Sequence, residues 1–564
     1  MATKAQPATA VAVPSTAQQC DVFILGSGLA GTTIASILAK QGANVVLVDA
    51  GQHPRFAIGE SQTPQLAEWL HILAERYEVP ELAKLADVGT TTREVGPMVG
   101  TKVHFGFIRH DKGKEPHPEQ TTQFAIPKLL AQNSHLFRQD SDSWMFHVAA
   151  RYGVTTRQLW FATDLDFDDD GVTITGRNGE VFRAKYLIDA SGFRSPLAEK
   201  FDLREKPARF KHHSRSMFTH YIGVKPFDDV SGHPQDKRPP IPWHKGTLHH
   251  MIDRGWFWII PFDNYEKSMN PLCSVGLTID ERTYPKPTDM TPEEEFNHFL
   301  DQYPAVKRQF EGAHRVREWV STDRLQYSSS RTIGHRWCLM SHAAGFIDPL
   351  FSRGLSNTME VVDALASRIL AALKDGDFSE ERFQYVEAVE TGLLNFNDEL
   401  VNSAFISFSH FKLWNAVFRV WGCFITPGVM RLSGARLRYV VDGNDRHFQA
   451  LEKTKNPGLW WPESTEFQRI LEAMAETCEK YEVGELSGDE AADIILKVVQ
   501  ESPEVNPTFG WKDPELRFVA PSTFMLARFI RWGLFAAGPD MRKLTRFVIS
   551  GALKAGPRAR QLLK

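Results

Sequence analysis

The sequence predicts an α/β fold with a doubly wound, Rossmann-like domain, a second β-sheet and a helical C-terminal region. Three observations support this prediction. A strand, a glycine-rich turn, a helix and a second strand follow one another within residues 21–50. Several β-rich runs separated by proline-rich loops occupy residues 214–282, and the chain is mainly helical after about residue 375. The 564 residues are 42% hydrophobic and 24% charged, as in a globular protein.

The first strand, helix and second strand are indicated by hydrophobicity and by a glycine. Residues 21–25 form a short apolar run, typical of a parallel strand that is buried on both faces. A helix is expected over residues 32–41, with Gly42 at its end. Residues 44–49 form the second strand, and Asp49 is its last residue.

The turn between the first strand and the helix has the spacing of a dinucleotide-binding loop. Three glycines match GxGxxG, and an acidic residue ends the next strand about 20 residues later. Glycine lets the backbone approach a pyrophosphate closely, the helix N-terminus offers free N–H groups, and a carboxylate accepts hydrogen bonds from ribose hydroxyls. The residues predicted to bind the cofactor are Gly26, Gly28, Ala30, Gly31 and Asp49. This loop alone does not distinguish NAD from FAD.

Two later segments favour FAD. Residues 186–192 are a strand that enters a turn of small residues, and residues 339–354 form a strand and a loop before a strong helix over 355–374. This arrangement resembles that of flavoprotein monooxygenases, although Ser341-His342 stands where those enzymes usually have Gly-Asp. The resemblance adds Asp189, Gly345, Asp348 and Arg138 to the cofactor-binding residues. For Arg138, a surface arginine in an ion pair is the alternative.

A tryptophan-rich strand narrows the reaction. Residues 255–261 contain the pattern WxWxIP, in which the two tryptophans share one face of a strand and the proline ends its pairing. Together with the flavin loops, this pattern resembles a signature of flavin-dependent halogenases, and two further segments resemble other signatures of that family. The residues that carry the resemblance are Trp256, Trp258, Pro261, Gly59-Glu60-Ser61 and the run from Gly345 to Ser352. The resemblance extends from about residue 20 to at least residue 420 and is greatest for the phenol and aromatic-polyketide branch.

The resemblance implies an FADH2-dependent halogenase with O2 and chloride as co-substrates. Hypochlorous acid would form beside the flavin, cross a tunnel to Lys102, and chlorinate an electron-rich aromatic ring of phenolic, polyketide type. Arg353 and Gly354 would hold the halide, and the tryptophan strand would keep the organic substrate from the flavin. A separate flavin reductase is expected to supply FADH2, because the chain has no second dinucleotide loop. A carrier protein that presents the ring, bromide in place of chloride, and a homodimer stay open.

The segment around Lys102, residues 99–108, alternates like a single strand. A period of two places Lys102 and His104 on one face and the neighbouring apolar side chains on the other. A buried lysine has a lowered pKa, which lets it meet an electrophile as a free amine. The alternative is a strand with a wetted polar face, in which case Lys128 or Lys245 would take the role.

Glu60 is predicted to orient this lysine or to take the ring proton, and the alternative is an acid that stabilises a helix N-terminus. His104 is a second candidate for the base, with a packed histidine as its alternative. No metal site is expected, because the adjacent pairs His212-His213 and His249-His250 point to opposite strand faces.

The composition excludes several other classes. The net charge of -4 gives no reason to expect a nucleic-acid partner. The five cysteines form no CxxC pair, so neither a zinc knuckle nor a disulfide framework is indicated, and they fit a reducing cytoplasm. No run of about 18 apolar residues and no signal peptide is present, so a cytoplasmic location is expected.

Two alternatives to the halogenase remain. A flavin-dependent aromatic hydroxylase would share the fold, and a non-catalytic flavin-binding or membrane-associated protein would use the aromatic C-terminal half differently. Residues 521–564 carry nine Lys or Arg and one acid among apolar residues, which suits either an anionic surface or a helical tail packed on the body.

The predicted organisation has four parts. They are a disordered leader over 1–19, a discontinuous FAD-binding domain over 20–200 with 325–375, a β-sheet region over 200–325 that covers the substrate and flavin, and a helical C-terminal region over 375–564 above the substrate cavity.

Overall fold

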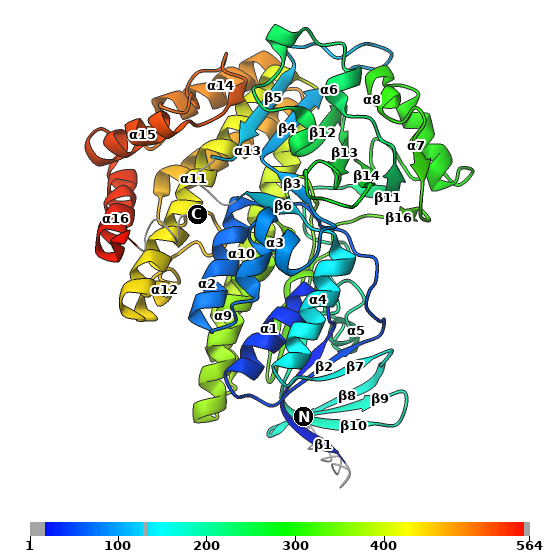
Figure 1. Cartoon of the computed structure of the whole chain (residues 1–564), viewed down its shortest axis with the longest axis vertical. Helices are drawn as coiled ribbons and strands as arrows, with labels where there is room; N and C mark the ends of the chain where they lie inside the picture. Colours follow the sequence, from blue (N-terminus) through cyan, green and yellow to red (C-terminus); the bar gives the residue numbers. More distant parts are fainter. Residues whose placement is uncertain (1–16, 128–131, 558–564) are drawn as a thin grey trace, which may run out of the picture.

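The computed structural model describes residues 17–127 and 132–557 (Figure 1). It contains two large β-sheets, one toward each end of the molecule, with long helices beside them (Figure 1). The first strand begins at Gln18, so Gln18 and Gln19 belong to the sheet and not to a leader. The rest of the predicted leader, residues 1–16, lies outside the described residues.

The first sheet has eight strands and a parallel centre, as a doubly wound fold requires. In the order β18-β10-β1-β2-β7, each strand runs parallel to its neighbour. The strands are β1 (Gln18–Leu25), β2 (Val45–Asp49), β7 (Thr155–Gln158), β8 (Ala162–Asp168), β9 (Gly171–Gly176), β10 (Val181–Asp189), β17 (Ile333–Gly334) and β18 (Trp337–Leu339). The first sheet therefore combines strands that come before residue 215 in the sequence with two strands that come after residue 321. The residues between them form most of the second sheet.

Three helices pack together beside this first sheet: α1 (Leu29–Lys40), α4 (Arg138–Arg151) and α9 (Gly354–Asp375). Helix α1 starts three residues earlier than predicted, directly after Gly28. Both faces of β1 are buried: Val22, Phe23 and Ile24 have no exposed surface. Helices cover one face of β1, and Trp160 together with apolar residues of β8 and β9 covers the other. A strand that is covered on both faces needs apolar residues at every position, which explains the apolar run in the sequence.

The second sheet has nine strands, mostly antiparallel, and β11–β14 form its centre. Its strands are β4 (His104–Arg109), β5 (Thr121–Ala125), β11 (Arg215–Ile222), β12 (Thr247–Ile252), β13 (Gly255–Pro261), β14 (Leu272–Ile279), β15 (His314–Arg315), β16 (Val320–Ser321) and β19 (Phe518–Val519). Strand β19 is unexpected in the helical half, and it extends the sheet beside β5.

Long helices make up the C-terminal half. They include α10 (Glu380–Ser407), α11 (Phe411–Asp442), α13 (Thr465–Glu482), α14 (Gly488–Glu501), α15 (Thr523–Phe535) and α16 (Pro539–Ala555). Trp414, Phe418 and Trp421 of α11 are buried against Phe105 and Phe107 of β4 in one aromatic cluster. The C-terminal half therefore packs directly onto the second sheet through aromatic rings, which bury large apolar areas.

Helices α15 and α16 carry the basic end of the chain. They lie along the outer edge of the molecule, and α16 packs against α11 (Figure 1). Phe529 and Met541 are buried, whereas Phe524 and Phe535 are largely exposed. Within the described ranges, no helix is both long and apolar enough to cross a bilayer.

One expectation about local structure was wrong. Residues 99–108 do not form one strand: β3 (Gly100–Lys102) pairs with β6 (Asn133–His135), and β4 belongs to the large sheet. Here tertiary contacts override the local sequence pattern. Residues 226–243, within the proline-rich loops, contain short helical turns and bury Trp243 against the sheet.

Candidate active site

The glycine-rich loop has the geometry of a phosphate cradle. A Cβ on Gly26 would lie 2.5 Å from the carbonyl oxygen of Ala190, and a Cβ on Gly31 would lie 1.9 Å from that of Gly26. These two glycines therefore allow close packing of strand, turn and helix. Gly28, at the N-cap of α1, faces open space, with no atom within 4 Å of an added Cβ. An open cradle at a helix N-terminus is where a pyrophosphate binds, so this loop fits a dinucleotide.

Asp49 stands at the end of β2, as predicted, and its carboxylate receives hydrogen bonds from the loop itself. The donors are the N–H and hydroxyl of Ser27, at 2.7 and 2.8 Å, and the N–H of Gly51 at 2.7 Å. Arg55 also pairs with it at 2.7 Å. Asp49 therefore holds the loop in shape, and its role toward a ribose stays a prediction.

Asp189 is buried, the side chain of Arg138 is 11% exposed, and both form hydrogen bonds within the protein. The carboxylate of Asp189 accepts bonds from Ser191, Ser195 and the N–H of Leu197, which shape the turn after β10. Arg138, the first residue of α4, pairs with Asp142 at 2.7 Å and donates to the carbonyl of Ile58 at 2.6 Å. Arg138 thus forms the ion pair that the alternative expected, but with little exposure to solvent, and its role toward the cofactor stays a prediction.

The loop before α9 connects both sheets. Asp348 accepts a hydrogen bond from the hydroxyl of Ser214 at 2.8 Å, which ties the loop to the second sheet. Gly345, Asp348 and Gly354 line one small cavity of about 50 Å³. Gly354 is the first residue of α9, whose N-terminus has no side-chain cap and no acidic residue in its first turn. Such a terminus favours an anion, which agrees with the halide position expected there.

Arg353, the other residue predicted to hold halide, is 3% exposed. Its guanidinium lies 4.3 Å from the ring centre of Phe396 and 4.9 Å from that of Trp460. Burial lowers the pKa of Arg353 to about 9. Its side chain therefore rests between rings, a cation–π arrangement.

Lys102 is completely buried at the end of β3. Its Nζ donates to the hydroxyls of Ser61 at 2.6 Å and Ser352 at 3.1 Å and lies 3.7 Å from the ring centre of Phe105. None of these partners is a carboxylate, and burial alone lowers the pKa of Lys102 well below its ordinary value. The structure thus brings Lys102 together with Ser61 and with Ser352, which lies in the loop before α9. It excludes a strand face in contact with water, because Lys102 is completely buried.

From the sequence, Ser352 was named only as the last residue of the run that resembles a family signature, with no role of its own. It adopts a positive φ of 55°, which is rare for a residue other than glycine and costs on the order of 1–3 kcal/mol. The next ring in the loop, Phe351, stacks on Trp421 of α11 at 5.1 Å, and Trp421 also contacts Phe105. No sequence pattern predicted this group of three contacting rings, Phe351, Trp421 and Phe105, because they come from three distant segments.

The tryptophan strand is β13. Trp256 and Trp258 are 2% and 4% exposed, and their ring centres lie 5.6 Å apart on one face. A Cβ on Gly276 of the neighbouring strand would lie 2.3 Å from the Trp258 ring, so this glycine provides the space for it. Pro261 ends β13, and its carbonyl accepts a hydrogen bond from His135.

The two candidate bases do not contact Lys102 by hydrogen bonds. Glu60 is buried, and its carboxylate lies 3.6 Å from Nε2 of His220. It precedes α2 (Pro64–Arg76) by several residues, so it is not in the first turn of that helix. His104 bonds to the carbonyls of Pro242 and Trp243. Lys102 and His104 belong to different strands, β3 and β4, which pair with different partners, so the single alternating strand expected for them does not exist.

The remaining lysine and histidine candidates lie elsewhere. Lys245 donates to the carbonyl of Asn264 at 2.5 Å, and Lys128 lies outside the described residues. His212 contacts Asp348, whereas His213 contacts Glu281. In the described part of the chain, no group of three or more His, Cys, Asp or Glu is placed to hold a metal ion.

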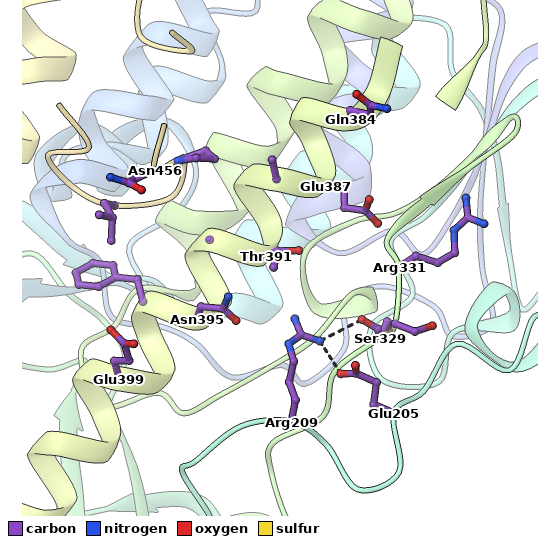
Figure 2. Close-up of a pocket in the computed structure, with 16 residues that line it drawn as sticks. Glu205, Arg209, Ser329, Arg331, Gln384, Glu387, Thr391, Asn395, Glu399 and Asn456 are labelled. Carbon is purple, nitrogen blue, oxygen red and sulfur yellow. Dashed lines mark hydrogen bonds and ion pairs between the residues drawn. The ribbon is translucent and has the colours of Figure 1, made fainter. Parts of the chain in front are cut away.

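A pocket of about 660 Å³ lies beside α10. Figure 2 shows the residues that line it. Its rim is polar, with Arg209 bonded to Glu205 and Ser329. Neither Lys102 nor the tryptophan strand lines this pocket, and Phe396 separates it from Arg353. The pocket is therefore distinct from the lysine site.

Comparison with known proteins gives concordant matches. The FAD binding domain family matches residues 19–325. Tetracycline 7-halogenase of Kitasatospora aureofaciens is 50% identical over 524 residues, which are 93% of this chain and 94% of that protein. Monodechloroaminopyrrolnitrin halogenase PrnC of Pseudomonas fluorescens is 42% identical over 531 residues, 93% of each chain. The crystal structure of halogenase PltM with phloroglucinol and FAD has a TM-score of 0.86 at 33% identity and covers 89% of this chain and 100% of that one.

These matches confirm the fold class, the cofactor and the enzyme class expected from the sequence. They leave no support for the hydroxylase or for the non-catalytic flavin-binding protein, because relatives of such identity and coverage are halogenases. The chain therefore belongs to the flavin-dependent halogenases, enzymes that use FAD to halogenate aromatic compounds.

Proposed function

We propose that this enzyme chlorinates an electron-rich phenolic ring, of the kind found in aromatic polyketides, and that Lys102 receives the hypochlorous acid. The observation that carries the proposal is the burial of Lys102 without a carboxylate partner, against Ser61 and Ser352. A charged ammonium is disfavoured in such a place, so the lysine gives up a proton readily and can then attack electrophilic chlorine as an amine.

The chain's own residues fit FAD. The open cradle at Gly28 would receive the pyrophosphate, with the backbone N–H groups of the first turn of α1, at Ala30 and Gly31, around it. Bound as FADH2, the cofactor would supply, with O2 and chloride, the hypochlorous acid. The uncapped N-terminus of α9 at Gly354 would hold the chloride, with Arg353 beside it.

Trp256 and Trp258 would form the wall that keeps the organic substrate away from the flavin. Both rings are buried on one face of β13, and Trp258 fills the space left by a glycine on the next strand. Glu60 remains a candidate to take the ring proton. For that role its carboxylate would have to turn from His220 toward the substrate.

The phenolic, polyketide-type substrate is supported by two relatives. Tetracycline 7-halogenase is named for a polycyclic substrate, and the PltM structure holds phloroglucinol, a phenol. We further propose that a separate reductase supplies FADH2 and that the aromatic substrate is free. Carrier-bound substrates, named for relatives of 26% and 25% identity, are an alternative, and a homodimer is compatible with the chain.

The test is product mass. The enzyme is incubated with FAD, a flavin reductase, NADH and a panel of phenolic compounds, in chloride and in bromide. We expect products that carry the isotope pattern of chlorine and that depend on added chloride. Oxygenated products without halogen would contradict the proposal, and activity only on carrier-bound rings would replace the free substrate.

A further inference from the structure

A chain of buried hydrogen bonds leads away from Lys102. Its Nζ donates to Ser61 Oγ at 2.6 Å, and Ser61 Oγ lies 2.7 Å from Thr247 Oγ1. Thr247 Oγ1 lies 3.1 Å from Nε2 of His135, whose Nδ1 lies 2.9 Å from the carbonyl oxygen of Pro261. All of these groups are buried, so water does not interrupt the chain.

The fold brings these groups together from distant segments. Lys102 and His135 end the paired strands β3 and β6, and Ser61 forms an isolated bridge with His135. Thr247 begins β12, and Pro261 ends β13. The hydrogen-bond chain therefore lies where the ends of four strands meet.

The acceptor at the far end sets the direction of every bond. A carbonyl only accepts, so Nδ1 of His135 carries the hydrogen that points at Pro261. In a neutral ring Nε2 is then bare and accepts from Thr247. The hydroxyl of Thr247, already donating, accepts from Ser61, and Ser61 accepts from Lys102. A proton can thus leave the lysine and reach His135 by one transfer at each hydrogen bond.

The charges around His135 agree with a neutral resting ring. Burial is the main cause that lowers the pKa of His135 to about 3, and Lys102, His104 and His244 lower it further. No carboxylate contributes to the pKa of His135 or of Lys102. Because both positions are buried and lack a counter-ion, the site favours at most one excess proton.

We infer that His135 stores the proton of Lys102, through Ser61 and Thr247, while the lysine carries chlorine. This inference rests on the proposed function of Lys102. First, an N–H bond of the ammonium breaks, each hydroxyl passes on one proton, and an N–H bond forms at Nε2. The amine then attacks hypochlorous acid: the N–Cl bond forms, the Cl–O bond breaks, and hydroxide leaves with one Nζ proton as water.

The return path closes the cycle. The aromatic ring attacks chlorine, so the C–Cl bond forms and the N–Cl bond breaks, and the electron pair stays on Nζ. Nζ then takes back the proton stored on His135, and the ring proton passes to the resulting amine. The net reaction converts hypochlorous acid and the aromatic compound to water and the chlorinated compound. His135 is a positioning residue in this scheme, because it acts only through Lys102.

Thr247→Val tests this inference with a single change of a hydroxyl to a methyl group. It breaks the relay while keeping both direct partners of Lys102, Ser61 and Ser352. Thr247→Ser restores the hydroxyl. The matched control is Thr278→Val, because Thr278 is a buried residue of the same sheet whose hydroxyl lies 2.7 Å from that of Ser216. His135→Gln, which keeps an acceptor but cannot take the proton, is the second test variant if Thr247→Val does not fold.

Two measurements are made at pH 6.5 and pH 9: the halogenation rate with FADH2, and the rate at which added hypochlorous acid forms an N–Cl bond at Lys102, read by peptide mass. For Thr247→Val we expect a loss of about tenfold or more at pH 6.5. The loss should shrink at pH 9, because a lysine whose pKa is lowered by burial is then present mainly as the amine and needs the relay less. Thr247→Ser should return toward the parental rate and pH profile.

Several outcomes would overturn the relay. They are an equal loss at both pH values, no recovery with Thr247→Ser, or the same pH-dependent loss in Thr278→Val. Failure of the proposed function appears differently, because the parental enzyme would then give no halogenated phenol. The N–Cl measurement at Lys102 still decides whether the relay exists in that case.

Discussion

The Nζ of Lys102 lies 3.1 Å from the hydroxyl of Ser352, a residue 250 positions further along the chain. Ser352 precedes Arg353 and Gly354, where the halide is expected, so one hydrogen bond links the lysine to the halide loop. Because Ser352 also adopts a positive φ, its backbone is strained in the orientation that reaches the lysine. This contact connects the residues proposed for the two steps of the reaction.

Lys102→Ala should lower the halogenation rate by about 100-fold or more. FAD binding and the oxidation of FADH2 should continue. The glycine-rich loop that would bind FAD and the side chain of Lys102 lie in different parts of the site. FAD binding should therefore not depend on the lysine. Lys102→Arg should fail as well, because a guanidinium stays protonated and offers no free amine. Chlorinated product from Lys102→Ala at a near-parental rate would contradict the assignment of Lys102 as the residue that receives hypochlorous acid.

Lys102→Met should stabilise the folded protein at neutral pH. Burial holds the pKa of Lys102 well below its ordinary 10.5, so the unfolded chain binds a proton that the folded chain does not. Stability of the parent therefore falls as pH drops below about 10.5, by about 1.4 kcal/mol per pH unit until the folded pKa is reached. Urea denaturation between pH 7 and pH 10 should show the gain of Lys102→Met shrinking as pH rises. A gain that is constant with pH would contradict a depressed pKa.

Ser352 allows the hydroxyl and the strained backbone to be separated. Ser352→Ala keeps the strain and removes the hydroxyl, whereas Ser352→Gly removes both. We expect both variants to lose roughly tenfold in halogenation rate, with Ser352→Gly more stable than Ser352→Ala by about 1 kcal/mol. Steady-state rates and thermal unfolding check the two effects. Equal stabilities would show that the positive φ carries no cost.

Gly28 and Gly31 should respond differently to alanine. At Gly28 an added methyl group meets no protein atom, so Gly28→Ala should fold normally and lose FAD affinity by roughly tenfold or more. At Gly31 the methyl group would lie 1.9 Å from the carbonyl oxygen of Gly26, so Gly31→Ala should lose stability as well. Flavin retention on dilution and thermal unfolding distinguish them. Equal flavin retention by Gly28→Ala and the parent would refute the loop assignment.

Trp256 and Trp258 should affect halogenation without preventing flavin oxidation. Alanine at either position would also cost about 3–5 kcal/mol, because both rings are buried. Phenylalanine is the milder change and keeps the strand packed. We expect lower halogenation per FADH2 consumed in all four variants. If rate and products stay unchanged, the strand serves only as core packing.

Much of the flavin half was predictable from local sequence. Buried parallel strands need continuous apolar runs, and a cradle at a helix N-terminus needs glycine, so β1, α1 and β2 were found within a few residues. The WxWxIP pattern and Lys102 pointed to the halogenase family through resemblance, and the relatives confirmed the family.

Tertiary structure alone decided how the lysine is surrounded. The period-two pattern over 99–108 hid the break at Val103, because pairing of β3 with β6 outside the large sheet depends on strands remote in sequence. The contact of Ser352 with Lys102, the contact of Trp421 with Phe105 and the hydrogen bonds from Ser61 to His135 have no local signal, since each depends on a partner far along the chain. A buried amine is a property of desolvation by all these neighbours together, and no single segment contains them.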